Sequence, residues 1–237
     1  MASHSYSPQS HQGPGKKEAK LPSFLKLENL KKKFSRDKQA APEPPPQALP
    51  FRAVQPGYGG TYVLGNTGVS HIGTDQSQTC VGVYFALDGL HCFAAHMNCW
   101  VKGTDTVPGG LAIPDQATYQ RLQQGIKDRL DQEVVRSQWP LQRTERMRDS
   151  LVMVCNFPAT DSQGQYWDTV VGNCIADAVA DWLSIPQGDG RRTLSKRGGF
   201  IVDHPGGVRE LFDHTIDASK WAAMPDHEGG SYWSFGV

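Results

Sequence analysis

The chain has 237 residues with 24 basic and 24 acidic side chains, a formal net charge of zero that gives no overall attraction for nucleic acid. It contains no run approaching the roughly 18 apolar residues of a membrane span and no secretory pattern at its N-terminus, so we expect neither a transmembrane segment nor export. Five cysteines without CxxC spacing favour reduced thiols in the cytoplasm or nucleus, and we expect neither a metal nor a cofactor.

The first 50 residues are predicted to form a disordered basic tail, followed by a single α/β globular domain over residues 51–237. Residues 1–20 are small and polar, and residues 40–50 are rich in proline, which favours an extended spacer. Lys and Arg outnumber Asp and Glu nine to four in the tail, whereas 20 acidic residues face 15 basic ones in the rest of the chain. The sequence therefore predicts a basic tail attached to an acidic globular part.

One segment of the tail, residues 22–38, combines apolar residues at helical spacing with lysine and arginine side chains. Its apolar positions are Phe24, Leu27, Leu30 and Phe34. Two interpretations stay open. The segment is either a basic amphipathic helix that binds a partner or a membrane surface, or a solvated tail that is only transiently helical.

Beyond Phe51 the pattern predicts short strands and two helices without a regular strand–helix–strand alternation. The expected strands cover residues 61–64, 69–72, 80–86, 90–97, 151–154 and 199–202, and the expected helices cover 115–136 and a segment through 175–183 that ends before Pro186. The strand at 69–72 is expected to return alongside the strand at 61–64, and the strand at 199–202 to be the last. This mixture favours an α+β fold, a layered α/β sandwich with a mainly antiparallel sheet.

The strand pair within residues 80–97 brings two reactive side chains together. A three-residue loop, Leu87-Asp88-Gly89, with Gly89 in the left-handed conformation, places Cys80 directly opposite His96. Gly82 and Ala94 on the same face leave room for another group. The other face carries the apolar residues Val81, Val83, Phe85, Phe93, Ala95 and Met97. A two-residue Asp88-Gly89 turn would instead put His96 on the opposite face from Cys80.

A cysteine beside a histidine can act as a nucleophile, because the imidazole accepts the thiol proton and later delivers it to a leaving group. Thr74, six residues before Cys80, is placed to orient the second nitrogen of the His96 ring through its hydroxyl. Backbone N–H groups in the turn just before Cys80 would stabilise an oxyanion. The three residues therefore predict a Cys-His-Thr catalytic site.

The stretch Thr74-Asp75-Gln76-Ser77-Gln78-Thr79-Cys80-Val81-Gly82-Val83, followed by Cys92-Phe93-Ala94-Ala95-His96-Met97, resembles the bacterial chemoreceptor glutamine deamidases. The spacing of 16 residues between Cys80 and His96 also resembles that of the cytotoxic-necrotizing-factor deamidase toxins. The resemblance, which covers about residues 60–100, implies a deamidase-like core and hydrolysis of a protein glutamine side chain to glutamate. Cys80 would be the nucleophile, His96 the general base and Thr74 the orienting group. Residues Asp75–Thr79 stand where that family has glycine-rich sequence.

Two other functions remain open. One is a non-catalytic protein-interaction module on the same fold, which would hold a partner through the basic tail and an aromatic C-terminal segment. The other is transglutaminase-like or peptidase activity from the same Cys80–His96 dyad, since transfer and hydrolysis pass through the same thioester. The C-terminal aromatic residues are expected to dock onto the core: Trp221, Tyr232, Trp233 and Phe235.

Cys174 is the rival nucleophile. It falls at a predicted helix start, where the helix dipole would lower the pKa of its thiol, and either His204 or His214 would have to reach it through the tertiary fold. Cys92 and Cys155 are expected to be packing residues in the core.

Overall fold

A computed structural model describes residues 47–64, 68–77, 80–100, 113, 115–136, 145–156, 171–213, 215–225 and 230–236. The chain divides into two units, Met1–Pro45 and Pro46–Val237, and every described residue belongs to the second. The basic segment predicted at residues 22–38 therefore lies outside the described residues, and the expectation of a partner or membrane surface for it stays a prediction.

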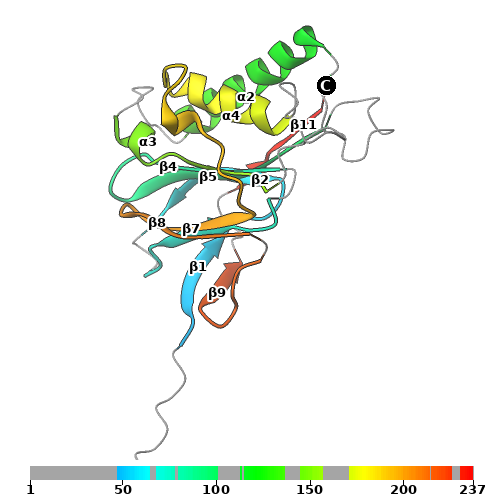
Figure 1. Ribbon diagram of the computed structural model, residues 1–237. Coiled ribbons are helices and arrows are strands. Elements are labelled where there is room, and N and C mark those ends of the chain that lie inside the picture. The colour runs from blue at the N-terminus through cyan, green and yellow to red at the C-terminus, as the bar shows by residue number, and fades with distance from the viewer. Residues whose placement is uncertain are drawn as a thin grey trace, which may run out of the picture. The chain divides into compact units, whose positions relative to one another are not determined.

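The second unit has an α+β fold with two mainly antiparallel sheets and three described α-helices, as predicted in its coarse form (Figure 1). The sheet that we call the outer sheet has the strand order β8-β7-β3-β1-β9. Its members are β1 (Leu49–Ala53), β3 (His71–Thr74), β7 (Gly199–Asp203), β8 (Gly207–Phe212) and β9 (Trp221–Pro225).

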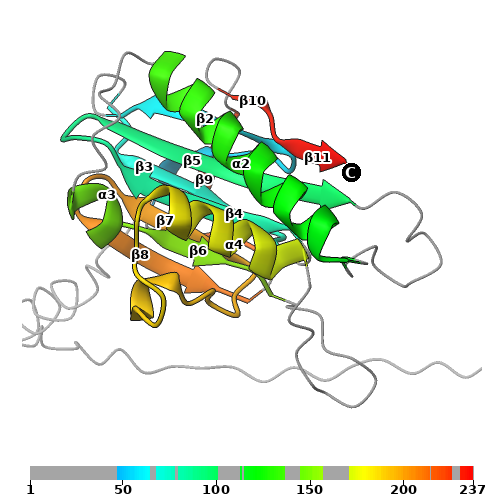
Figure 2. The same ribbon diagram turned by 90° about the horizontal axis from the view of Figure 1, so that it is seen from above.

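The second sheet, which we call the central sheet, has the order β10-β2-β5-β4-β6, with β11 also paired to β5. Its members are β2 (Tyr58–Val63), β4 (Val81–Ala86), β5 (His91–Trp100), β6 (Val152–Val154), β10 (Ser231–Tyr232) and β11 (Ser234–Gly236). The helices are α2 (Gln116–Arg136), α3 (Glu145–Asp149) and α4 (Val171–Trp182), with a 3-10 turn at Gly190–Arg192. Helices α2 and α4 cover one face of the central sheet, and the outer sheet lies on the other (Figures 1 and 2).

Alternation along β4 and β5 explains this layering, since successive strand residues face opposite sides of a sheet. The face predicted to be apolar packs against the helices, with Val83 and Phe93 fully buried among helix residues. The alternate residues face the outer sheet, where Tyr84 and Ala94 pack against residues such as Phe200. The apolar face was therefore predicted correctly.

Helix α2 begins as the sequence predicts. The Asp115 carboxylate accepts a hydrogen bond from the Thr118 backbone N–H at 2.7 Å, which satisfies one of the unpaired donors of the first turn. Its apolar positions, including Ile126 and Leu130, are fully buried against α4. The second predicted helix is α4, which ends before Pro186 but begins at Val171, earlier than its apolar pattern indicated.

Two predictions about connectivity are wrong. The strand predicted at 69–72 does not return beside β2, because β3 belongs to the outer sheet and pairs in parallel with β1. The strand at 199–202 is not the last, since β8 and β9 follow it in the outer sheet and two short strands follow in the central sheet. Short polar strands such as β8 lack the alternation that marks a half-buried strand.

The C-terminal aromatic residues divide between core and surface. Trp221 and Trp233 are buried, and Phe235 is partly buried against the helix-facing core. Tyr232 is 64% exposed, so its predicted docking is wrong. Its ring meets that of Tyr58 edge-to-face, with centroids 5.8 Å apart, and the two form an exposed aromatic pair.

Candidate functional site

Thr74 and His96 meet between the two sheets. Thr74 is the last residue of β3 in the outer sheet, and His96 lies on the face of β5 that looks toward that sheet. The Thr74 hydroxyl and His96 Nδ1 are 2.8 Å apart, and the same hydroxyl donates to the Val54 carbonyl at 2.9 Å. Because the hydroxyl proton is committed to Val54, the hydroxyl accepts from Nδ1–H. This fixes the tautomer of His96 and leaves the lone pair on Nε2.

The His96 ring is held neutral. Its side chain is almost completely buried, and this burial lowers the pKa of the imidazole from 6.5 to about 4. Its Nε2 has no hydrogen-bond partner among the described residues. A neutral imidazole whose Nδ1–H is anchored and whose Nε2 lone pair is unused is the form that accepts a proton in general-base catalysis.

Cys80 does not lie directly opposite His96, so the predicted register is wrong by one pair. Gly82 is the residue opposite His96, and Cys80, one residue before β4, aligns with Asn98. The Cys80 thiol donates to the Asn98 side-chain oxygen at 3.7 Å. Cys80 is therefore the diagonal neighbour of His96, where Cβ atoms lie roughly 7 Å apart or somewhat less.

The turn chemistry explains the shift. The loop has three residues, as predicted, but they are 88–90, because the Leu87 N–H donates to the His91 carbonyl at 2.9 Å. The Asp88 carboxylate accepts from the N–H groups of Leu90 and His91 at 2.6 and 2.7 Å, which makes Asp88 the first loop residue. Gly89 is not in the left-handed conformation expected for it. Moving the loop by one residue shifts the pairing by two, so Cys80 and His96 remain on the same face.

Gly82 makes the close approach of the two sheets feasible. A Cβ atom at this position would lie 2.9 Å from Thr74 Cγ2 and 3.1 Å from the Ser77 hydroxyl. Only a residue without a side chain fits there, which agrees with the prediction that Gly82 leaves room on the Cys80 face. The absence of a side chain opposite His96 is what lets Thr74 reach the ring.

The segment before Cys80 is tightly held. Gln76 has a φ of 57°, a left-handed conformation that glycine adopts more readily than glutamine, and it stands where the resembled family has glycine-rich sequence. The Ser77 N–H donates to the Gly198 carbonyl at 2.7 Å, and the Ser77 carbonyl accepts from Asn156 at 2.8 Å. Ser77 N–H is thus unavailable to an oxyanion. The rest of the predicted oxyanion turn, residues 78–79, lies outside the described residues.

Sequence reasoning missed two neighbours of this site. Asn98 was detectable, because it lies two residues after His96 on the same strand face and contacts the Cys80 thiol. Ser77 gave no signal, since its position depends on hydrogen bonds to residues more than 70 positions away. Its side chain is completely buried, and its hydroxyl has no partner among the described residues.

The rival thiol, Cys174, is not a nucleophile of the predicted kind. It lies inside α4, is completely buried, and donates to the Tyr119 carbonyl at 3.6 Å. Burial raises the pKa of this thiol to about 12, the opposite of the expected lowering by a helix dipole. His204 lies between the sheets, away from α4, and His214 lies outside the described residues.

The other two cysteines predicted to be packing residues behave as expected. Cys92 and Cys155 are buried in the two largest apolar clusters, and burial raises the pKa of the Cys92 thiol well above its ordinary value. Cys80, which is partly exposed, is the most accessible thiol among the cysteines whose side chains are described.

A second buried histidine lies between the sheets. His204 follows β7, as predicted for a strand end before the Pro-Gly-Gly turn, and its Nδ1 is 2.7 Å from the Tyr84 hydroxyl. Burial raises the pKa of the phenol and lowers that of the imidazole. The sequence indicated His204 as a strand-end residue and as a candidate partner for Cys174, but not its contact with Tyr84.

Comparisons with known proteins identify no relative. A scan against protein-family models, a search of curated proteins and a search of solved structures each found no match. Among the described helices, none is long and apolar enough to cross a membrane. The functional assignment therefore depends on the geometry of the site.

Proposed function

We propose that this protein is a cysteine-dependent amide hydrolase of the protein-glutamine deamidase type, with Cys80 as nucleophile, His96 as general base and Thr74 as the orienting residue. The central observation is the pair of hydrogen bonds made by the Thr74 hydroxyl, which donates to the Val54 carbonyl and accepts from His96 Nδ1–H. These bonds leave the lone pair of the neutral imidazole on Nε2. The deamidase-like core belongs to this proposal. It is supported by the two stacked sheets with helices on one face.

The reaction proceeds through a thioester. The Cys80 thiol passes its proton to His96 Nε2, and the sulfur attacks the carboxamide carbon of a glutamine side chain. His96 then gives the proton to the amide nitrogen, the carbon–nitrogen bond breaks and ammonia leaves. A water molecule next loses a proton to Nε2 while its oxygen attacks the thioester. The carbon–sulfur bond breaks, and the proton returns to sulfur, leaving glutamate and the free enzyme.

Cys80 and His96 have different surroundings in this structure. The Cys80 thiol is bonded to the Asn98 oxygen, and His96 Nε2 has no hydrogen-bond partner among the described residues. The proposal requires that rotation about the Cys80 side-chain bond bring the sulfur to Nε2, and the placement of both side chains on one sheet face supports this. Catalytic hydrogen bonds are often long in unliganded enzymes and tighten in the substrate complex.

The contact between Cys80 and Asn98 favours one alternative, a non-catalytic protein-interaction module on this fold. If the thiol stays on Asn98, the Thr74–His96 contact serves only to join the sheets. That alternative predicts that replacing Cys80 has no effect on any activity of the protein.

Ammonia release from a pool of short glutamine-containing peptides tests the proposal, with an electrophilic glutamine analogue, a chloromethyl ketone, as a second probe of the same thiol. Cys80→Ala is expected to abolish both ammonia release and labelling, a loss on the order of 10⁴-fold or more. Cys92→Ala, which removes the buried thiol on the same sheet face, is the matched control and should retain both. Wild-type labelling only at other cysteines, with no ammonia released, would contradict the proposal. Incorporation of an added primary amine would identify a transglutaminase instead.

A further inference from the structure

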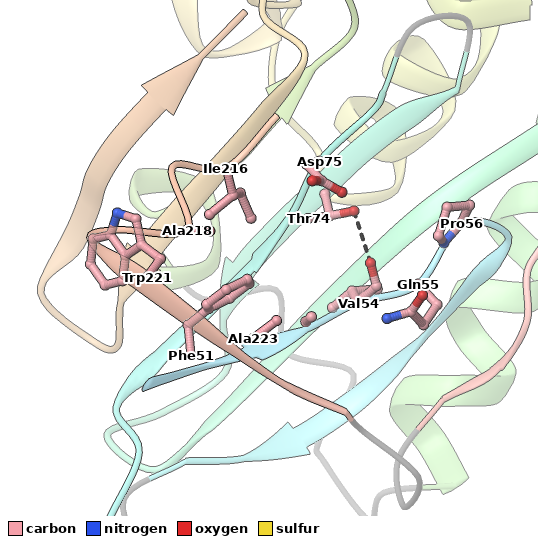
Figure 3. Close-up of a pocket in the computed structure, with 11 residues that line it drawn as sticks. Phe51, Val54, Gln55, Pro56, Thr74, Asp75, Ile216, Ala218, Trp221 and Ala223 are labelled. Atoms are coloured by element: carbon pink, nitrogen blue, oxygen red, sulfur yellow. Dashed lines mark hydrogen bonds between the residues drawn. The ribbon is translucent and has the colours of Figure 1, made fainter. Parts of the chain in front are cut away.

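A pocket of about 270 Å³ lies on the outer sheet beside Thr74 (Figure 3). Its walls are mostly apolar, and the rings of Phe51 and Trp221 meet edge-to-face with centroids 6.4 Å apart. Figure 3 shows these rings toward one end of the pocket and Gln55 and Pro56 toward the other. Sites for drug-sized ligands are usually about 300–1,000 Å³, so this pocket fits a single side chain better than a large ligand.

One lining residue of the pocket is hydrogen-bonded to His96, and a second is the chain neighbour of a residue that is. Thr74 lines the pocket and holds His96 Nδ1 through its hydroxyl. Pro56 also lines it, and the next residue, Gly57, donates its N–H to the His96 carbonyl at 3.0 Å. Thr74 therefore belongs both to the lining of the pocket and to the candidate site, whereas Cys80 and His96 do not line the pocket.

Among the described residues, Asp75 is the only charged one that lines the pocket. Its carboxylate makes no hydrogen bond or ion pair with the rest of the described chain, and Figure 3 shows it beside Thr74, on the side of the pocket opposite Phe51 and Ala223. Apolar walls with one carboxylate match a side chain that has an aliphatic stem and a cationic end, because the stem packs on the walls while the cation pairs with the carboxylate. An acidic side chain would be repelled.

We propose that this pocket receives an arginine or lysine side chain adjacent to the target glutamine of a protein substrate. The inference rests on the proposed deamidase function, and it names the substrate class of that site. The excess of acidic residues in 51–237, 20 against 15 basic, favours the approach of a basic peptide.

Short peptides with one glutamine and either arginine, norleucine or glutamate beside it test the proposal on the full-length protein. Each flanking residue is placed once before and once after the glutamine. For one of these two positions, we expect the KM for ammonia release to be about tenfold lower for the arginine peptide than for the norleucine peptide. The KM should be highest for the glutamate peptide. Equal KM values for all three on both sides would overturn the proposal.

Two variants locate the effect in the pocket. Asp75→Asn, which keeps the size of the side chain, should remove the difference between the arginine and norleucine peptides. Ala223 is exposed on β9 and lines the pocket, so Ala223→Trp should raise the KM for the arginine peptide at least tenfold more than it changes that of N-acetylglutaminamide. Ala222→Trp, the exposed neighbour that does not line the pocket, is the control and should leave the ratio unchanged.

Calorimetric binding separates failure of this inference from failure of the proposed function. If no peptide releases ammonia but the arginine peptide binds wild type more tightly than Asp75→Asn and Ala223→Trp, the deamidase function fails and the pocket assignment stands. If ammonia is released without dependence on the flanking residue, the function stands and the pocket assignment fails. A synthetic peptide of residues 22–38 is the last ligand. If the Ala223→Trp substitution weakens the binding of this peptide and of no other, the pocket binds the chain's own basic segment and the inference is overturned.

Discussion

Two buried histidines lie between the sheets of this protein. Each contacts a hydroxyl group, and the two differ in whether that hydroxyl makes a second hydrogen bond. His96 and His204 each place Nδ1 within 2.8 Å of a hydroxyl, each has a pKa lowered by burial, and each has an Nε2 without a partner among the described residues. Thr74 gives its proton to Val54 and must accept from His96. Tyr84 has no second partner within the described structure, so no further hydrogen bond sets which of Tyr84 and His204 donates to the other.

Only the tautomer of His96 is therefore fixed by a second hydrogen bond of the hydroxyl that contacts the ring. In the proposed mechanism the Nε2 lone pair of His96 serves as the base, whereas the hydrogen bond of His204 assigns its proton to neither ring nitrogen. The neighbouring thiols differ too, because Cys80 is partly exposed and Cys92 is completely buried. In the proposed mechanism, the hydrogen bond from Thr74 to Val54 is what distinguishes His96 from His204 as the base.

The largest expected effect comes from removing each ring in turn. His96→Asn keeps a donor for Thr74 but lacks the base, so the kcat for ammonia release should fall about 10²–10⁴-fold. His204→Asn should lower the free energy of unfolding while leaving the kcat of the folded fraction within about twofold of wild type. Equal losses of kcat in both variants would show that the two histidines do not differ in function.

The hydroxyl groups of Thr74 and Tyr84 are compared by replacing each residue with one of similar shape that lacks the hydroxyl. Thr74→Val leaves the Nδ1–H of His96 and the Val54 carbonyl without partners, which should cost about 1–3 kcal/mol of stability. The kcat should also fall on the order of tenfold or more, and Thr74→Ser should restore it. Tyr84→Phe should cost a similar free energy of unfolding with kcat unchanged. A Thr74→Val variant that loses stability but keeps full kcat would assign Thr74 a structural role only.

The close packing of the two sheets at the position opposite His96 is tested by adding one methyl group to Gly82. Gly82→Ala should reduce the free energy of unfolding by about 1–3 kcal/mol, because its Cβ would overlap Thr74 Cγ2 and Val154 Cγ2, each 2.9 Å away. Gly89→Ala, where a Cβ meets nothing within 4 Å, is the control and should be nearly neutral. Urea denaturation measures both, and equal stabilities would show that the sheets can separate at this point without cost.

The pH dependence of stability tests the burial of both histidines. The pKa of His96 is near 6.5 in the unfolded chain and about 4 in the folded protein, so its contribution is complete above pH 6.5 and is lost as pH falls toward 4. Between pH 7 and pH 5 the loss is about 2 kcal/mol. The pKa of His204 is lowered too and adds to the loss with the same sign. His96→Asn should reduce the slope, and an unchanged slope would contradict the assigned burial.

The sequence predicted the contact between Thr74 and His96 better than it predicted the connectivity. Alternation in β4 and β5 identified the apolar face, and the spacing of Thr74, Cys80 and His96 placed all three near one point. The register was missed because Asp88, rather than Leu87, begins the loop by accepting two backbone N–H groups. The position of β3 in the outer sheet and the contact between Tyr84 and His204 depend on tertiary pairing, for which a local pattern carries no information.

The most direct test is the rate at which the chloromethyl ketone analogue of glutamine labels Cys80, followed by mass spectrometry of the modified peptide at pH 7. The expected result is selective labelling of Cys80 in wild type, slowed on the order of 100-fold in His96→Asn and unchanged in His204→Asn. Labelling of Cys80 at the same rate in all three proteins would contradict the claim that His96, through its bond to Thr74, activates this thiol.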